Sequence, residues 1–360
     1  MLTRMGSLNA LEQDKGNSFW RRWLGRELPS SDTMGRVFSL IILDSIRFLI
    51  HHVYTRLKRN KAIKKTCGFY VLIIDGHESS SSYLRCCSGC LRRRVHTREG
   101  ERIQYYHRNV IAMLSGEDFP ILLDEEEQRK GEDEVAAAIR LLKRILKNYP
   151  RAFEVVVTDG LYLEAPFFKL LLDHGKDVIA VLKDERRDLM EDAKGLFQYE
   201  EPMIRIEGRT KRLMWDIEGF TSWESLKRKI RVVRSLETTT VCRQRTGEVE
   251  EETSDWMWAT TLSQKKTSTE AIVNLGHSRW LIENKALNEM VTYWHADHVY
   301  KHHPTAISAF WLTLMLALNL FRAFLYLNIK PELRSKHSNL YFSRLICSEL
   351  YDGSLQRAPP

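Results

Sequence analysis

Two apolar runs that end in the same dipeptide constrain this chain most. Residues 69–74 are followed by Asp75 and a glycine, and residues 153–158 are followed by Asp159 and a glycine. A run that is apolar throughout is typical of a strand covered on both faces of a sheet. We therefore predict two neighbouring buried strands that end at Asp75 and Asp159, with each glycine freeing the backbone to turn.

The order of the other predicted elements indicates a mixed sheet. Two strand-like runs follow the first strand, and then helix, strand, helix, strand and helix alternate before a β-rich stretch and a helical end. The predicted strands are 103–114, 119–123 and 177–182; the helices are 132–148, 165–174, 186–197 and the region from 267 onward; the β-rich stretch is about 200–262. This order fits the α/β class, with an RNase H-like mixed sheet flanked by helices and a β-rich insertion.

A small helical domain is predicted at the N-terminus. A Ser or Asp within residues 28–33 caps a helix with one apolar face and a basic end. The apolar face is formed by Val37, Phe38, Ile41, Ile42, Ile46, Leu49, Ile50 and Val53. We predict a basic helical DNA-binding region at 1–66, a catalytic domain at 67–330 and a C-terminal tail at 331–360.

The positive charge is concentrated in the predicted N-terminal region. Residues 1–66 contain 13 Lys or Arg and 5 Asp or Glu, whereas the whole chain contains 55 and 47, so the other residues balance at 42 each. A basic arm on a neutral body favours a polyanionic partner such as nucleic acid. The alternative is a solvated basic helix with no partner.

Neither a secretory signal nor a membrane span is predicted. The first twenty residues contain no apolar core of a signal peptide. Residues 306–329 are long enough to cross a bilayer, but they include Asn319 and Arg322, so we predict a buried C-terminal helix. Six cysteines are too few for a disulfide scaffold, and we expect reduced thiols or metal ligands in the cytoplasm.

The two strand-end aspartates suggest a divalent cation. Active sites of open α/β sheets lie beyond the carboxyl ends of the strands, and oxygen ligands there suit Mg²⁺ or Mn²⁺. An Asp that only caps a turn is the alternative. On a helix, Arg279 and Glu283 share a face, either as a surface ion pair or as a phosphate-binding Arg beside a third metal ligand.

Cysteine spacing raises the question of zinc. Cys87 and Cys90 have the spacing of a zinc knuckle, beside Cys86, but no second Cys-x-x-Cys exists in the sequence. His77, His96 or His107 could complete a site, yet we favour free thiols in a loop. The isolated cysteines Cys67, Cys242 and Cys347 are expected to be core or surface thiols.

Two further clusters have a plain and a functional interpretation. Residues 294–303 are rich in His, for which we favour a polar helix end facing DNA or solvent over a metal cluster. Trp256 and Trp258 share one face of a predicted strand, where packing is favoured over stacking on a base.

From about residue 28 to 327 the chain resembles the DDE transposases of bacterial insertion sequences, in the subgroup with a β insertion before the last catalytic helix. The segments that carry the resemblance are 71–76, 156–162, 174–183 and 279–284. The resemblance implies that Asp75, Asp159 and Glu283 bind two Mg²⁺ or Mn²⁺ ions, and that Arg279 contacts DNA beside Glu283.

The implied activity is cleavage of element ends and their joining to target DNA by two-metal phosphoryl transfer. The implied partners are terminal inverted repeats, target DNA and a second copy of the chain in a synaptic homodimer. The implied location is the bacterial cytoplasm, at the nucleoid. Further DNA contacts are expected from Asn284, Lys285, Arg56, Lys58, Arg59 and Lys61.

Two positions depart from the subgroup's pattern. Gly276 stands where the pattern has Tyr, and Met290 stands where it has a Lys expected to hold a DNA phosphate. Two alternatives therefore stay open: an RNase H-like nuclease without strand transfer, and a catalytically inactive or truncated transposase-derived DNA-binding protein.

Overall fold

The computed structural model describes residues 6–116, 119–183, 187–243 and 247–350, which form two compact units. The first unit consists of Met1–Lys64, Gly76–Asn148 and Ile282–Pro360, and the second of Lys65–Asp75 and Tyr149–Leu281. Strand β1 (Val71–Ser82) belongs to the second unit as far as Asp75 and to the first unit from Gly76.

The second unit is built on a mixed sheet. The first half of β1 pairs in parallel with β5 (Val155–Thr158), and β5 pairs in parallel with β6 (Asp177–Val181). The sheet continues antiparallel through β10 (Val249–Thr260), β9 (Ile230–Cys242), β8 (Thr210–Phe220) and β7 (Met203–Glu207). The parallel strands are buried, as their apolar runs predict, while β7 at the far edge is exposed throughout.

Helices cover this sheet. Buried aromatic and aliphatic side chains of α6 and α8 pack against the parallel strands, and α7 packs against β8. The helical segments of this unit are η1 (Gly160–Tyr162), α6 (Ala165–Asp173), α7 (Arg187–Phe197), η3 (Glu224–Leu226) and α8 (Thr269–His277); α9 (Trp280–Ile282) lies at its border.

The first unit contains most of the helices, and its strands β2 (Leu91–Thr97), β3 (Gly100–Leu114) and β4 (Ile121–Glu127) belong to the same ten-stranded sheet of the described residues, in which β3 neighbours β1. Strand β3 pairs antiparallel with both β2 and β4. The helical segments are α1 (Leu8–Gln13), α2 (Ser18–Leu24), α3 (Ser31–Leu40), α4 (Leu43–Arg59), α5 (Glu134–Asn148), the π-helical η4 (Glu283–Leu287), α10 (Asn288–Trp294), α11 (Pro304–Asn328), α12 (Pro331–Arg334) and α13 (Asn339–Leu350).

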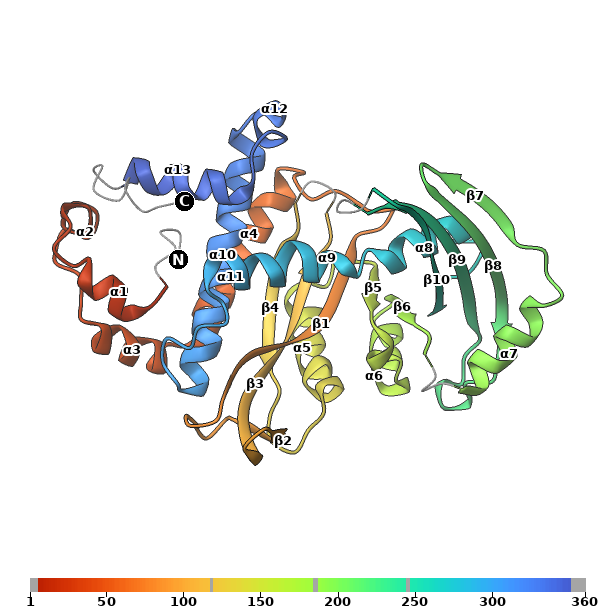
Figure 1. Cartoon of the computed structure of the whole chain (residues 1–360), viewed down its shortest axis with the longest axis horizontal. Coiled ribbons are helices and arrows are strands. Elements are labelled where there is room, and N and C mark those ends of the chain that lie inside the picture. Colours follow the sequence, from red (N-terminus) through yellow and green to blue (C-terminus); the bar gives the residue numbers. More distant parts are fainter. Residues whose placement is uncertain (1–5, 117–118, 184–186, 244–246, 351–360) are drawn as a thin grey trace. The chain divides into compact units, whose positions relative to one another are not determined.

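Helix α11 forms the core of the first unit. It runs beside α4 and packs on β4 (Figure 1), and most of its side chains are buried. The fully buried Asn319 accepts a hydrogen bond from the Leu122 N–H at 2.9 Å and donates one to the Leu122 carbonyl at 2.7 Å. The helix is long and apolar enough to span a membrane, but its burial confirms the prediction of a core helix.

The predicted single N-terminal helix is wrong. Ser30 does cap α3, but the chain breaks at Ile41 and Ile42, and α3 and α4 meet at an angle of 84°. The break rotates the two segments, so the predicted apolar face does not stay together. Ile50 is fully buried, while Val37 and Ile42 are 55% and 71% exposed.

Strand β1 is longer than predicted. It does not stop at Asp75 but continues to Ser82, through the serines at positions 79–82. Its second half is polar and mostly half-buried, so a search for continuous apolar stretches does not find it. The predicted α/β class, a mixed sheet flanked by helices, is nevertheless confirmed.

The compact units do not follow the predicted domain borders. The helices of residues 1–64 belong to the same unit as residues 76–148, and the described part of the tail forms α12 and α13. One tie is an ion pair of 2.9 Å between Arg47 of α4 and the buried Asp124 of β4. The division into functional regions at 1–66, 67–330 and 331–360 stays a prediction.

Candidate active site

The two predicted aspartates lie at neighbouring parallel strands. The pairing of β1 with β5 runs to Ile73 and Val157, and Asp75 and Asp159 each follow two residues after this last pair. Asp75 is buried inside β1, and Asp159 directly follows β5. Two carboxylates placed in this way repel each other unless cations lie near them.

Positive side chains accompany both aspartates within the second unit. Arg279 Nη1 lies 3.0 Å from Asp75 Oδ2, with little of either side chain exposed. Lys183 Nζ lies 3.6 Å from Asp159 Oδ2. Asp159 also accepts a hydrogen bond from the Leu161 N–H at 2.8 Å and so caps η1. It therefore also has the capping role that was the alternative interpretation of this aspartate.

The glycines after the aspartates have a different role from the predicted one. Neither has the positive φ that a tight turn would demand of glycine. A Cβ on Gly160 would lie 2.8 Å from Lys183 Cδ and 3.0 Å from the Val181 carbonyl oxygen. A Cβ on Gly76 would lie 2.3 Å from the Glu134 carboxylate. Both glycines therefore permit close approach of a charged side chain rather than a turn.

The regular helix predicted around Arg279 is interrupted. Helix α8 ends at His277, and a turn follows in which the Arg279 N–H donates to the Gly276 carbonyl and the Leu281 N–H to the Ser278 carbonyl. The Arg279 guanidinium also lies over the Trp280 ring, 4.4 Å from its centroid. The assumed four-residue spacing of one continuous α-helix is therefore wrong here.

Glu283 belongs to the first unit, at the start of η4. A π-helical turn leaves the backbone out of α-helical register and is often found at functional sites. The buried Arg322 of α11 donates to the Lys285 carbonyl within this turn and pairs with Glu289 at 3.1 Å. The carboxylate triad as a whole stays a prediction.

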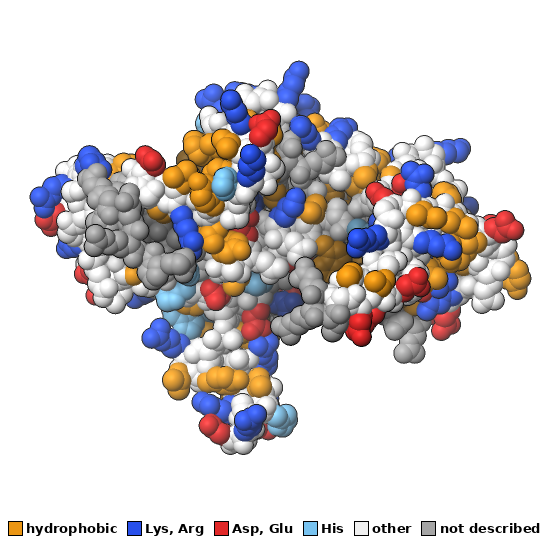
Figure 2. Space-filling model, turned by 45° about the horizontal axis from the view of Figure 1, so that its top comes forward, with side chains coloured by type: hydrophobic (Ala, Val, Ile, Leu, Met, Phe, Trp, Pro, Cys, Tyr) orange, Lys and Arg blue, Asp and Glu red, His pale blue; other side chains and the backbone are white. Residues whose placement is uncertain are grey.

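The other predicted DNA contacts lie in the first unit. Asn284 and Lys285 line a pocket of about 360 Å³ with Arg322 and Asn339. The basic residues that follow Tyr54 in and after the last turns of α4 are all exposed, and they also suit the negative end of the helix dipole. They are Arg56, Lys58, Arg59 and Lys61. On the face drawn in Figure 2, basic side chains are dispersed among acidic and hydrophobic ones.

The two departures from the subgroup's pattern have a structural explanation. A Cβ on Gly276 would lie 2.3 Å from the indole nitrogen of Trp258, so the larger residue of the pattern has no room. Met290 is fully buried in α10, where a Lys would lose its hydration. Trp258 is itself buried and stacks 6.2 Å from Trp256, so packing, as favoured, explains this pair.

The predicted candidates for metal ligands come together only in part. Cys87 and Cys90 come together with His107, and the fourth member is His302 from the His-rich segment. His96 is exposed and His77 packs on Trp311, so neither takes part. This convergence does not decide between the favoured interpretations, free loop thiols and a polar His-rich end, and a metal site, so both stay predictions.

Sequence reasoning also missed three charged groups. Lys183 lies within a segment quoted for the resemblance, but nothing in its spacing connects it to Asp159. Glu134 lies in the acidic first turn of α5, where the helix dipole already explains an acid. Glu127 ends a strand whose four last residues are all acidic, which the predicted strand 119–123 left out.

The mixed sheet with its flanking helices is that of an RNase H-like α/β protein. Residues 68–320 match the model of the family described as the transposase DDE domain. This match covers well over half of the 360 residues, so the chain belongs to the DDE transposase family, and its function is of the transposase type. A search of curated proteins gave no match.

Proposed function

We propose that the chain is a DNA transposase in which Asp75, Asp159 and Glu283 hold two divalent cations, Mg²⁺ or Mn²⁺. Such a pair of cations supplies activation of water or a 3′-hydroxyl and stabilisation of the leaving 3′-oxygen. The reaction is cleavage at the ends of the element and joining to target DNA. It requires no covalent intermediate between protein and DNA.

The observation that carries the proposal is the register of β1 and β5. It pairs Ile73 with Val157, two residues before Asp75 and Asp159, within the range of residues that matches the family. Only oxygen ligands are involved, which suits Mg²⁺ or Mn²⁺. Arg279 neutralises Asp75 in the absence of a cation and is the residue expected to meet a DNA phosphate.

The proposed partners are the terminal inverted repeats, target DNA and a second copy of the chain in the synaptic complex. The exposed residues at the end of α4 would supply sequence-independent phosphate contacts. Asn284 and Lys285 would approach the DNA nearer to Glu283. We place this activity at the nucleoid in the bacterial cytoplasm.

The test is cleavage and joining of DNA that carries the flanking inverted repeats, with Mg²⁺ or Mn²⁺. Asp159→Asn is compared with Asp173→Asn, which changes an exposed aspartate at the end of α6. We expect metal-dependent cuts and joined products from the wild type and from Asp173→Asn, and a loss of about 10³-fold or more for Asp159→Asn. Equal activity of both variants would reject the assignment.

A second candidate is a catalytically inactive, transposase-derived DNA-binding protein, and Gly276 and Met290 favour it. Both positions are fixed by packing, against Trp258 and in the core respectively, and offer no polar group to DNA. Binding of the inverted repeats without any metal-dependent cut would select this function. Cuts without joined products would select an RNase H-like nuclease.

A further inference from the structure

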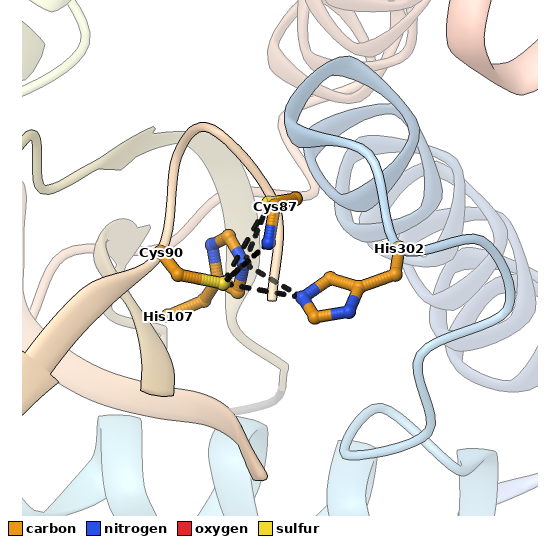
Figure 3. Close-up of side chains that lie close together, drawn as sticks. All are labelled: Cys87, Cys90, His107 and His302. Atoms are coloured by element: carbon orange, nitrogen blue, oxygen red, sulfur yellow. Dashed lines mark hydrogen bonds between the residues drawn. The ribbon is translucent and has the colours of Figure 1, made fainter. Parts of the chain in front are cut away.

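Four potential metal ligands of the first unit converge in the structure (Figure 3). Cys87 and Cys90 lie in the loop between β1 and β2, His107 lies on β3, and His302 lies just before α11. Their ligand atoms all lie within 4.8 Å of one another. Cys90 and His107 are almost fully buried, at 1% exposure each.

Five of the six distances between these atoms are close to those of a tetrahedral site, and the sixth, between Cys87 and His302, is within 4.8 Å. Zn–S bonds of about 2.3 Å and Zn–N bonds of about 2.05 Å at tetrahedral angles give separations of about 3.8 Å for S···S, 3.3 Å for N···N and 3.6 Å for S···N. The two Sγ atoms are 3.7 Å apart and the two Nε2 atoms 3.4 Å apart. The His107 Nε2 atom lies 3.4 and 3.2 Å from the two sulfurs, and the His302 Nε2 atom lies 3.3 Å from Cys90 Sγ.

The surroundings of the cluster are also those of a metal site. His107 Nδ1 lies 2.5 Å from a carboxylate oxygen of Glu127, which fixes the ring so that Nε2 faces the sulfurs. The Cys87 N–H donates to Cys90 Sγ at 3.2 Å. A Cβ on Gly89, between the cysteines, would lie 2.9 Å from Pro304 of α11, so the loop is pressed against the start of that helix.

We propose that Cys87, Cys90, His107 and His302 bind one structural Zn²⁺ ion that ties the loop between β1 and β2 to the start of α11. Two thiolates and two imidazoles prefer Zn²⁺ over the hard cations that carboxylates bind. The four ligands leave no open position, so the ion has no part in phosphoryl transfer. The proposal does not depend on the proposed function.

The test is the zinc content of the full chain, purified without a histidine tag after growth with added Zn²⁺. We expect about one Zn²⁺ per chain. Cys90→Ser should lose it, whereas Cys86→Ser, which changes an exposed neighbouring thiol, should retain it. Equal zinc in Cys90→Ser and the wild type, or a wild type without zinc, would overturn the proposal.

Two further measurements keep the test valid if Cys90→Ser does not fold. The wild type loaded with Co²⁺ should show the intense visible bands of a tetrahedral ion and a thiolate-to-metal charge-transfer band, and a weak octahedral spectrum would refute the site. Glu127→Gln keeps all four ligands and should weaken zinc affinity about 10- to 100-fold in a chelator competition. An unchanged affinity would contradict the position assigned to Glu127.

Discussion

At the scale of single residues, Gly276 is a helix position where the surrounding packing leaves no space even for a methyl group. Glycine in a helix interior usually costs stability relative to Ala. At Gly276 the added Cβ would lie 2.3 Å from the ring of the buried Trp258, which cannot move aside without disturbing its stack on Trp256. Packing against one side chain therefore reverses the usual preference.

We expect Gly276→Ala to lower the free energy of unfolding by about 1–3 kcal/mol through overpacking. Its matched control is Gly195→Ala in α7, where the added Cβ would meet nothing within 4 Å and stability should rise by about 1 kcal/mol. Urea unfolding of the two variants and the wild type measures both changes. A stabilised Gly276→Ala would contradict the packing argument.

A second residue prediction concerns pH. Glu125 of β4 is fully buried, and burial, with the neighbouring Asp124 carboxylate, raises the pKa of Glu125 from 4.5 to about 8. Between pH 4.5 and about 8, Glu125 therefore keeps a proton in the folded chain that it has released in the unfolded chain. The free energy of unfolding should accordingly fall as the pH rises from 4.5 to about 8.

Glu125→Gln should remove this part of the pH dependence, because an amide does not titrate. Unfolding by urea across the same pH window checks it. The control is Glu251→Gln on β10, an exposed position where the slope should match that of the wild type. The same slope in all three proteins would show that Glu125 does not titrate as described.

At the scale of elements, α11 packs on strand β4 and satisfies backbone groups of that strand. Among the described strands β4 pairs only with β3, and the Asn319 side chain satisfies the N–H and carbonyl of Leu122 from the other side. Asn319→Leu would leave both backbone groups buried and unpaired, and we expect a loss of about 2–5 kcal/mol in unfolding free energy.

The matched control for Asn319→Leu is Asn328→Leu, at the exposed end of the same helix. We expect its effect to stay within about 0.5 kcal/mol. Denaturant unfolding compares the two variants. Similar small effects at both positions would show that Leu122 finds other hydrogen-bond partners.

Elements with one dominant local signal could be predicted from sequence, and those set by distant contacts could not. Strands β5 and β6 have continuous apolar runs and were found almost to the residue. The break between α3 and α4 falls inside an apolar segment without Gly or Pro, so nothing local marks it. The π-helical turn at Glu283 accepts a hydrogen bond from Arg322, 37 residues beyond Lys285.

The candidate sites likewise combine residues that a local sequence signal predicts with residues that only distant contacts bring together. Asp75 and Asp159 follow apolar runs, so their place at neighbouring strands could be predicted once parallel strands were assumed. Cys87 and Cys90 can be recognised in the sequence by their Cys-x-x-Cys spacing. His302 is 212 residues away from Cys90, and no local pattern connects the two. Lys183 meets Asp159 only because β6 is the neighbour of β5 in the sheet.

At the scale of the whole molecule, the excess charge of residues 1–66 predicts how DNA binding depends on salt. Each phosphate contact contributes about 0.9 to the slope of log affinity against log salt concentration. Changing Arg56, Lys58, Arg59 and Lys61 together to Gln should flatten this slope by about 3 to 4. Changing exposed Lys143 and Lys147 on α5 to Gln is the control. Equal slopes in the wild type and in both variants would show that these four residues of α4 and its end do not contact DNA phosphates.

The contact between Asn319 and Leu122 also has a consequence for synthesis. The two residues are 197 positions apart, and Tyr149–Leu281 of the second unit is made entirely between them. At about 5–20 residues per second, synthesis of the residues between Leu122 and Asn319 takes about 10–40 s. During this time the edge of β4 has no α11 to pack against. A nascent chain that stalls before residue 319 therefore exposes a strand edge able to pair with another chain, which makes translation speed through α11 a determinant of yield.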